Sequence, residues 1–339
     1  MAANGDGEGV RGRITAAVIG CGDVSAVHLR AIEKLAGAEL VGVCDTDPAR
    51  AAAAAQRYGA PWFADHRQLL GSVRPDVVHV CTPHHQHVAV AVDCLDAGVA
   101  VLIEKPVAHT VAEADRLITA ARARPDVKVG ICLQNRYNTT ARTVRDLLGS
   151  GDLGPVRGGS AMVLWHRDPA YYQARPWRGR VRESGGGVLI NQAIHTLDLM
   201  EWLLGDVQRV RGHAGRYGLD GVDIEDTASV LLDHAGGARS VVFATVANAV
   251  DSPVTIEIVT ERAVLVIRGD LTVSHADGRV ETVAEPVVST GGRGYWGASH
   301  ERLIEDFYRT LSDPEPFWIG PREGARSLRL IDQIYHQNR

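Results

Sequence analysis

The sequence places two side chains capable of proton transfer at the end of an apolar segment. That segment, VAVLIEKP, ends in Glu104, Lys105 and Pro106, and Lys105 is one of only three lysines among 36 basic residues. An arginine stays protonated in proteins, whereas the pKa of a lysine can fall far enough for its amine to act as a base. This position therefore favours a titratable cation over a permanent one. We expect Pro106 to fix the turn and Glu104 to orient Lys105 or contact a cofactor.

A second set of polar side chains falls on one face of an expected helix. In GGGVLINQAIHTLDL, Asn191, His195 and Asp198 stand at i, i+4 and i+7, positions that share a helix face. An imidazole there can exchange a proton near neutral pH. The Asn191 amide cannot ionise, so it can orient His195 or a substrate hydroxyl but cannot serve as a base. A lone histidine on a helix is more often structural than catalytic, so the surrounding elements must decide its role.

A glycine-containing turn near the start has the pattern of a dinucleotide-binding loop. AAVIGCGDVS places Gly20, Gly22 and Ser25 after an apolar run, in the order G-x-G-x-x-S. Gly20 would allow a tight turn, Gly22 would let the backbone approach a pyrophosphate, and Ser25 would keep helix and strand close. We expect Asp23 to cap the helix and Val24 to lie in the same cofactor-binding loop. Taken alone, such small residues are often only a turn.

The following apolar segment strengthens the cofactor prediction. It ends at Asp45, 20 residues beyond Ser25, where an acidic side chain accepts hydrogen bonds from the adenosine ribose. Asp45 and Asp47 would also repel a 2′-phosphate, which favours NAD over NADP. Arg50 lies close by and could soften that preference.

Further cofactor contacts are expected where later strands end. VCTPHHQH (80–87) and IEKP (103–106) follow expected strands, and ligands of parallel sheets bind beyond the carboxyl ends of the strands. We expect these cofactor contacts from the strand ends: Thr82, Pro83, His84, His87, Glu104, Lys105 and Asn135. His84, His85 and His87 also suggest a metal site. No acidic or thiol partner stands at ligand spacing, so we predict no metal.

The elements that must position these groups divide the chain in two. From residue 14 to about 133, short β-type runs alternate with amphipathic stretches, the pattern of a doubly wound parallel sheet covered on both faces. Later strand-like segments between Gly, Asp and Pro turns favour an antiparallel sheet, with one helix around 191–204 and two late helices. We predict a disordered lead-in (1–12), an α/β Rossmann domain (13–136) and an α+β domain (137–339) with an open, mostly antiparallel sheet. The last helix could pack back on the first domain.

Composition excludes several classes of partner. A net charge of −5 and a pI near 6.3 give no electrostatic reason to expect nucleic acid or an anionic membrane. No apolar run approaches the length of a membrane span, and we expect no secretory signal. The five cysteines stand at wide spacing in apolar settings, which favours reduced, buried thiols in a cytoplasmic protein.

On these motifs the sequence resembles the glucose–fructose oxidoreductase / inositol dehydrogenase / MocA (Gfo/Idh/MocA) family. The resemblance rests on GCGDVSAVHLRAI, CDTDPARA, CTPHHQHVAVAVDCLDAG, VLIEKPVA and GGGVLINQAIHTLDL, and it runs from about residue 14 to the end. It implies that Lys105 is a hydrogen-bonding acid/base group and that His195 is its partner across the substrate. It also implies an open sheet that is often buried in homodimers or homotetramers. Asn191 departs from the aspartate that many dehydrogenases of the family carry there.

The resemblance implies an NAD-dependent oxidoreductase acting on a secondary hydroxyl of a sugar, sugar derivative or cyclitol. A second possibility is an NAD-retaining enzyme that oxidises its substrate transiently and cleaves a glycosidic or ether bond. A non-catalytic NAD-binding regulator is a third. Polar and aromatic residues expected on the substrate side are Gln134, Asn135, Arg136, Trp165, His166, Arg167, Tyr171, Tyr172, Trp177, Arg178, Asn191 and His195. Arg167 or Arg178 could pair with a phosphate or carboxylate, whereas His300 is expected to be a helix cap or a surface residue.

Overall fold

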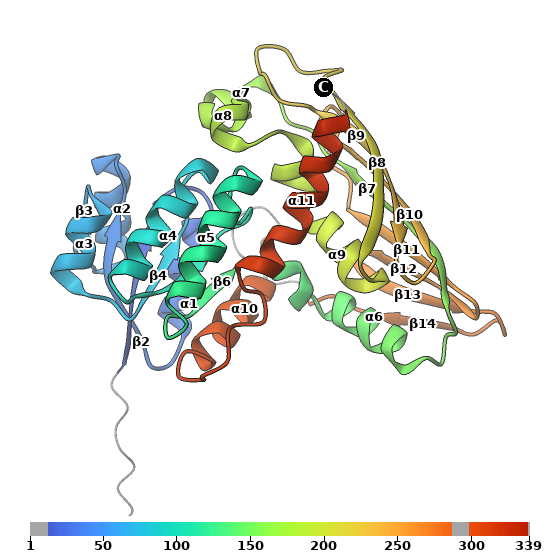
Figure 1. Cartoon of the computed structure of the whole chain (residues 1–339), viewed down its shortest axis with the longest axis horizontal. Helices are drawn as coiled ribbons and strands as arrows, with labels where there is room; N and C mark the ends of the chain where they lie inside the picture. The colour runs from blue at the N-terminus through green and yellow to red at the C-terminus, as the bar shows by residue number, and fades with distance from the viewer. Residues whose placement is uncertain (1–12, 287–297, 338–339) are drawn as a thin grey trace, which may run out of the picture.

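The first half of the chain forms a six-stranded parallel sheet (Figure 1). The computed structural model describes residues 13–286 and 298–337, so the predicted disordered lead-in (1–12) lies outside the described residues. The strand order is β3-β2-β1-β4-β5-β6. The strands are β1 (Ile14–Ile19), β2 (Ala38–Cys44), β3 (Trp62–Phe63), β4 (Val77–Val80), β5 (Ala100–Ile103) and β6 (Val129–Ile131).

The crossovers of this sheet are helices. They are α1 (Ser25–Lys34), α2 (Pro48–Tyr58), α3 (His66–Val73), α4 (His87–Asp96) and α5 (Val111–Ala123). Local chemistry sets the bounds of α2: the Asp47 side chain accepts from the backbone N–H groups of Ala49 and Arg50, and Gly59 ends the helix at φ +69°. All four residues of β4 are buried, including His79 among its three valines. The predicted doubly wound fold is confirmed.

The second half forms an eight-stranded sheet in the order β14-β13-β12-β11-β7-β10-β9-β8. Its strands are β7 (Val156–Leu164), β8 (Val207–Gly215), β9 (Thr227–His234), β10 (Arg239–Thr245), β11 (Thr255–Thr260), β12 (Ala263–Arg268), β13 (Asp270–His275) and β14 (Val280–Val283). All neighbours are antiparallel except β7 and β10, which confirms the mostly antiparallel prediction. Exposed polar residues dilute the apolar pattern of β8, β13 and β14.

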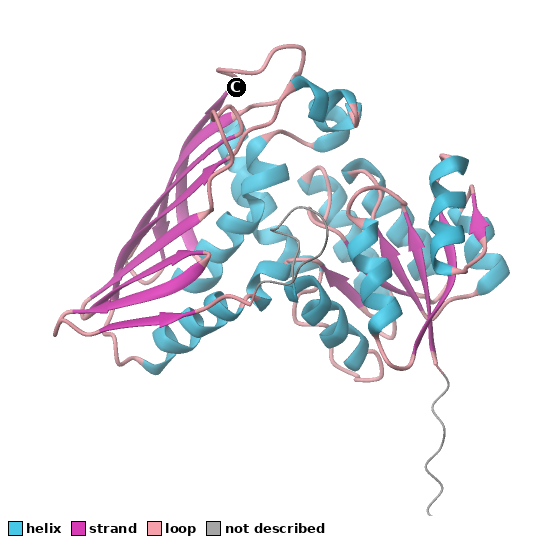
Figure 2. Ribbon diagram, turned by 180° about the vertical axis from the view of Figure 1, so that it is seen from behind, coloured by secondary structure: helices cyan, strands magenta, loops and turns pink. Residues whose placement is uncertain are grey.

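The helical elements of the second half lie mainly on one side of this sheet (Figures 1 and 2). They are α6 (Thr139–Ser150), α7 (Pro169–Gln173), α8 (Val181–Ser184), α9 (Ile194–Leu204), α10 (Ala298–Arg309) and α11 (Pro321–Gln337). Two short turns follow strands of the first sheet: η1 (His84–Gln86) after β4 and η2 (Gln134–Tyr137) after β6. Two more belong to the second half: η3 (Pro176–Gly179) and the π-helical η4 (Leu189–Ala193). The sheet's other face carries no helix of the described chain.

The two late helices join the halves of the molecule. Helix α10 packs against α1 and η2, while α11 packs against α5 of the first domain and against α9 and β8 of the second. Buried apolar residues of both domains form one continuous core. No helix among the described residues is both long and apolar enough to cross a membrane. All five cysteines are free thiols, and four of them are buried.

Candidate active site

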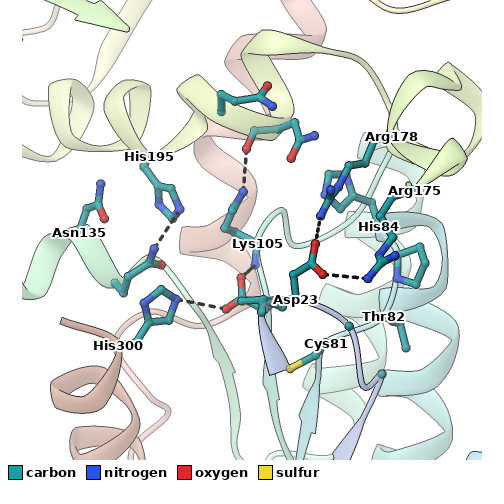
Figure 3. A pocket seen from close by; sticks show the side chains of 18 of the residues that line it. Asp23, Cys81, Thr82, His84, Lys105, Asn135, Arg175, Arg178, His195 and His300 are labelled. Carbon is teal, nitrogen blue, oxygen red and sulfur yellow. Dashed lines mark hydrogen bonds and ion pairs between the residues drawn. The ribbon is translucent and has the colours of Figure 1, made fainter. Parts of the chain in front are cut away.

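A cavity of about 1010 Å³ lies at the carboxyl ends of the parallel strands and extends to the second domain. Figure 3 shows that side chains from both domains point into it. Of the predicted site residues, those that line it are Gly20, Gly22, Asp23, Val24, Asp45, Arg50, Thr82, Pro83, His84, His87, Glu104, Lys105, Gln134, Asn135, Trp165, Arg167, Tyr171, Trp177, Arg178, Asn191 and His195. Residues separated by nearly two hundred positions therefore share one space.

The dinucleotide-type loop has the geometry that its glycines suggest. Gly20 has φ +94°, and a Cβ placed there would lie 2.6 Å from the carbonyl carbon of Cys81. A Cβ on Gly22 would meet nothing within 4 Å, so the loop offers open space to a phosphate group. The Ser25 hydroxyl donates to the Gly22 carbonyl at 2.6 Å and is buried. The turn therefore packs against Cys81 at Gly20 and is open at Gly22, which lines the cavity.

Asp23 does not cap α1, so that expectation is wrong. Val24 occupies the N-cap position without a side-chain cap. The Asp23 carboxylate instead accepts from Arg175 at 2.8 Å and from Arg178 at 3.0 Å (Figure 3). Both arginines belong to the second domain, so this pair of ion bridges spans the cavity. Sequence reasoning missed Arg175, because nothing in its local pattern indicates a partner 152 residues away.

Asp45 lies at the end of β2 with part of its carboxylate engaged. It accepts from the backbone N–H groups of Cys21 and Asp47, each at 2.8 Å. Arg50 also lines the cavity, and its Nε lies 3.2 Å from the Asp47 carboxylate. Asp45 and Arg50 thus line one end of the same cavity.

The loop after β4 carries two buried histidines. Nδ1 of His84 lies 2.7 Å from the Ser184 carbonyl oxygen, and its ring stands edge-on to Trp177 at 4.7 Å. His87 lies between the carbonyl oxygens of Pro106, 2.8 Å away, and Thr82, 2.9 Å away. Burial lowers the pKa of both histidines. Nδ1 of His84 donates to the second domain, whereas a neutral His87 ring has one N–H and can donate to only one of its two carbonyl neighbours.

Lys105 is half-buried and reaches the second domain. Its Nζ donates to the backbone carbonyl oxygen of Asn191 at 2.7 Å (Figure 3). Burial lowers the Lys105 pKa to about 8, while Glu104 pulls it upward and Arg178 pushes it further down. About a tenth of the amine is therefore neutral at pH 7, far more than for an ordinary lysine, as a base requires. The backbone carbonyl of Asn191, rather than its side-chain amide, therefore holds the Lys105 amine.

His195 faces the same cavity from the second domain, with a free donor. Its Nε2 lies 3.1 Å from the amide nitrogen of Gln134, which can only donate, so Nε2 is the acceptor. Burial holds the His195 pKa well below its usual value, and the charge of Lys105 adds to that effect. A neutral ring that accepts at Nε2 carries its proton on Nδ1, which is buried and has no hydrogen-bond partner among the described residues. A ligand oxygen would satisfy it.

Arg136 and Asp198 are placed away from the cavity. Arg136 Nε and Nη2 donate to Asp198 at 2.9 and 2.6 Å, and Nη1 lies 2.8 Å from Glu323. Both members of the first pair are buried, so the predicted substrate contact of Arg136 is replaced by an internal ion pair. The predicted shared helix face fails because the chain makes a π-turn over Leu189–Ala193, which changes the residue spacing along the helix face.

Two further expectations are corrected. Tyr172 is 6% exposed and does not line the cavity, whereas its neighbour Tyr171 does. The two rings pack edge-on at 5.0 Å, so only one of them can face the ligand. His300 is not a surface residue: it is 1% exposed, and its Nε2 lies 3.4 Å from Glu104 (Figure 3).

The remaining substrate-side residues form an aromatic and cationic wall. Arg167 pairs with Asp251 at 2.9 Å, and its guanidinium lies over the rings of Trp165 and Tyr171. Arg178 lies over the Tyr171 ring at 4.5 Å. Flat apolar faces beside hydrogen-bonding groups suit a hydroxylated ring.

Known proteins share both halves of this arrangement. Residues 14–131 match the family model described as "Oxidoreductase family, NAD-binding Rossmann fold", and residues 141–266 match the "GFO/IDH/MocA C-terminal domain". The chain therefore belongs to the Gfo/Idh/MocA oxidoreductase family.

Individual relatives agree with this assignment. The chain is 33% identical over 242 residues to D-apiose dehydrogenase of Paraburkholderia graminis, which covers 70% of this chain but only 61% of that relative. It is 30% identical over 257 residues to inositol 2-dehydrogenase of Rubrobacter xylanophilus, covering 74% and 70% of the two chains. The crystal structure of the WlbA dehydrogenase from Bordetella pertussis, in complex with NADH and UDP-GlcNAcA, superimposes with a TM-score of 0.82 at 28% identity over 96% of each chain.

Proposed function

We propose that this protein is an NAD-dependent dehydrogenase that transfers a hydride between nicotinamide and a secondary hydroxyl of a sugar, sugar derivative or cyclitol. One observation carries the proposal: an amine with a lowered pKa and a neutral imidazole, from different domains, line one cavity with a dinucleotide-type loop. Relatives named for D-apiose and inositol support the substrate class.

The residues present fit NAD. Gly20, Gly22, Val24 and Ser25 form an open loop at a helix N-terminus, which suits a pyrophosphate. The Thr82 hydroxyl is buried without a partner among the described residues, as expected of a group awaiting a ligand. The cofactor set we propose is Gly20, Gly22, Asp23, Val24, Ser25, Asp45, Arg50, Thr82, Pro83, His84, His87, Glu104, Lys105 and Asn135. The position of Asp45 supports NAD over NADP.

The chain's own groups supply the proton chemistry. When bound, NAD⁺ accepts the hydride. Neutral Lys105 takes the hydroxyl proton, and the Asn191 carbonyl oxygen keeps the amine in place. The Nδ1 proton of His195 is free to bind the substrate oxygen and orient it. Asn135, Trp165, Arg167, Trp177 and Arg178 would hold the rest of the substrate.

A screen of NAD⁺ reduction at 340 nm tests the proposal. Inositols, pentoses, hexoses, amino sugars and nucleotide sugars should be offered, and at least one should give net NADH. Lys105→Met and His195→Ala should each lower kcat for that substrate by about 10²-fold or more, the scale of a lost acid–base group. Turnover without net NADH, or full activity in the Lys105 variant, would contradict the proposed reaction.

We also propose a cytoplasmic homodimer or homotetramer that associates through the second sheet. Five free cysteines support the location. Exposed apolar side chains on the sheet support the assembly: Val241 is 50% exposed, Met162 38% and Phe243 37%. Phe243 is the direct cross-strand partner of Met162, so these residues form one patch that a second copy could cover.

A further inference from the structure

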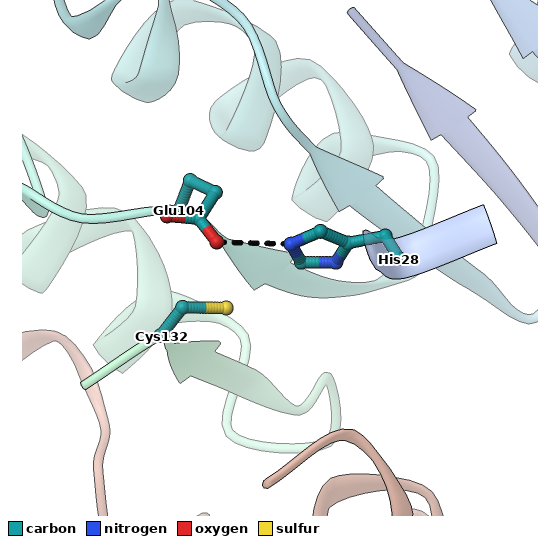
Figure 4. A group of neighbouring side chains, drawn as sticks. All are labelled: His28, Glu104 and Cys132. Carbon is teal, nitrogen blue, oxygen red and sulfur yellow. Dashed lines mark hydrogen bonds and ion pairs between the residues drawn. The ribbon is translucent and has the colours of Figure 1, made fainter. Parts of the chain in front are cut away.

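A continuous row of buried side chains leads away from Glu104 beneath the cavity. Nε2 of His28 lies 2.9 Å from Glu104 Oε1 (Figure 4), and Nδ1 of His28 lies 2.7 Å from Nδ1 of His79. Nε2 of His79 lies 2.9 Å from the Tyr308 hydroxyl. His28 and His79 are 0% exposed, Glu104 4% and Tyr308 6%. Polar groups this deep are retained only when each has a partner.

The hydrogen bonds of this row have a direction. Burial, with His28 adding to it, holds the pKa of His79 well below its usual value, so this ring is neutral and has one N–H. Burial raises the pKa of Tyr308, so its hydroxyl keeps the proton and can donate to His79 Nε2. His79 then donates from Nδ1 to His28 Nδ1. This leaves the His28 proton on Nε2, where it points at Glu104. Each ring nitrogen of His28 and His79 then takes part in one hydrogen bond, as a donor or as an acceptor.

The row explains why a buried carboxyl can stay charged. Burial by itself would raise the Glu104 pKa, but the hydrogen bond from His28 and the close approach of His300 hold it well below its usual value. Cys132 lies beside them (Figure 4), and its sulfur and the His28 and Glu104 ligand atoms lie within 4.8 Å of one another. The 2.9 Å separation of His28 and Glu104 is that of a hydrogen bond, so we interpret the group as a hydrogen-bonded chain.

We propose that His28, oriented by His79 and Tyr308, is a positioning residue that keeps Glu104 ionised and thereby sets the proton affinity of Lys105. The carboxylate of Glu104 is the charge that favours the ammonium form of Lys105, against burial and against Arg178. The other titratable groups that interact electrostatically with Lys105 or Glu104 are His28, His79, Cys81, His84, His87, Cys132, His195 and His300. The role of this row in catalysis rests on the proposed function, but its effect on Lys105 does not.

The small number of lysines makes a direct measurement possible. Protein labelled with [ε-¹³C]lysine should give three resonances, from Lys34, Lys105 and Lys128, and Lys105→Met identifies the one of interest. In the cofactor-free protein, we expect the Lys105 titration midpoint to fall by about half a unit or more in His28→Leu, because an opposing charge nearby is partly lost. Tyr308→Phe should move it in the same direction by a smaller amount, and Glu104→Gln by at least as much as His28→Leu.

Tyr335→Phe is the matched control. It also removes a single buried tyrosine hydroxyl, one that donates to the Glu225 carboxylate at 2.7 Å rather than to His79, and it should leave the Lys105 midpoint unchanged. If His28→Leu does not fold, Tyr308→Phe decides, because it removes a single oxygen. An unchanged Lys105 midpoint in whichever of these two variants folds overturns the proposal.

Activity provides an independent readout. With a substrate found in the screen, the acid limb of kcat/KM should move to lower pH in His28→Leu, by the shift seen in the Lys105 resonance. If no substrate reduces NAD⁺ with the unaltered protein, the proposed function fails, yet the lysine titration still decides the present inference. If the substrate is turned over and the limb does not move, the inference fails and the function stands.

Discussion

At the scale of single residues, the site depends on what surrounds each ionisable group. A lysine with an ordinary pKa is almost fully protonated at pH 7 and cannot accept a proton. Burial of Lys105 lowers its pKa to about 8, whereas the same burial keeps His195 neutral. Two groups with unlike environments can therefore take unlike roles, the amine as base and the imidazole as hydrogen-bond donor.

The pH dependence of the reaction should report the state of Lys105. The base must be neutral, so kcat/KM for alcohol oxidation should fall as pH falls through a midpoint near 8 and should level off above it. Rates with a substrate from the screen would be measured across this range. Lys34→Met, at an exposed lysine paired with Glu301, should leave the profile unchanged. A profile that is flat, or that rises toward acid pH, contradicts the assigned base.

Gly20 should be far less replaceable than a glycine in the same backbone region with open surroundings. Gly59→Ala places a Cβ where φ is +69° but nothing lies within 4 Å, so we expect a cost of about 1–2 kcal/mol. Gly20→Ala adds a 2.6 Å clash with the Cys81 carbonyl and should destabilise the protein by clearly more. Urea unfolding of both variants makes the comparison. Equal losses would show that the turn is not closely packed.

At the scale of elements, polar side chains join the segments that carry the catalytic pair. Gln134 and Arg136 belong to the η2 turn after β6, and they contact His195 and Asp198 in the first turns of α9. The π-turn η4 precedes α9 and presents the Asn191 carbonyl to Lys105. The first domain thus fixes η4 and α9 of the second domain through contacts at the cavity, by Lys105 and Gln134, and through the buried Arg136–Asp198 pair outside it.

Breaking the buried ion pair should reduce stability rather than substrate choice. Asp198→Ala removes the bidentate partner of the buried Arg136 guanidinium and leaves it only Glu323, which should destabilise the protein, by up to about 3–5 kcal/mol. Asp277→Ala removes a carboxylate from the exposed pair with Arg279 and should change stability little. Denaturant unfolding measures both. If Asp198→Ala keeps the unfolding midpoint and raises KM, then the ion pair belongs to the substrate site after all.

At the scale of the whole molecule, the outer face of the eight-stranded sheet carries no helix of the described residues, and it is the face of the proposed contact with another copy. Helices of the second domain cover the inner face of the eight-stranded sheet, and they separate it from the first domain (Figures 1 and 2). Residues of β10 alternate between buried and exposed, so its outward side chains are presented together. The ion bridges of Asp23 and the packing of α10 and α11 hold the two domains around the cavity.

A charge on the outer face should prevent association. Phe243→Lys puts an ammonium in the centre of the apolar patch, so the assembly should dissociate to monomers that keep the secondary structure. Light scattering after size-exclusion chromatography gives the mass. Trp62→Lys alters another exposed aromatic residue (44%, against 37% for Phe243), on β3, and should not change the mass. A monomeric unaltered protein at micromolar concentration would rule out this assembly.

The sequence by itself determined the parallel sheet, the dinucleotide-type loop and the strand ends that carry Thr82, Glu104 and Lys105. Those features depend on residues adjacent in the chain, through apolar periodicity and turn chemistry. Only the tertiary structure decided which polar groups meet. Lys105 finds a carbonyl 86 residues away, and His79 finds the Tyr308 hydroxyl 229 residues away. Local patterns encode whether a side chain is buried, but its partner is set by how distant elements pack. For that reason Arg136 pairs with Asp198 in the interior.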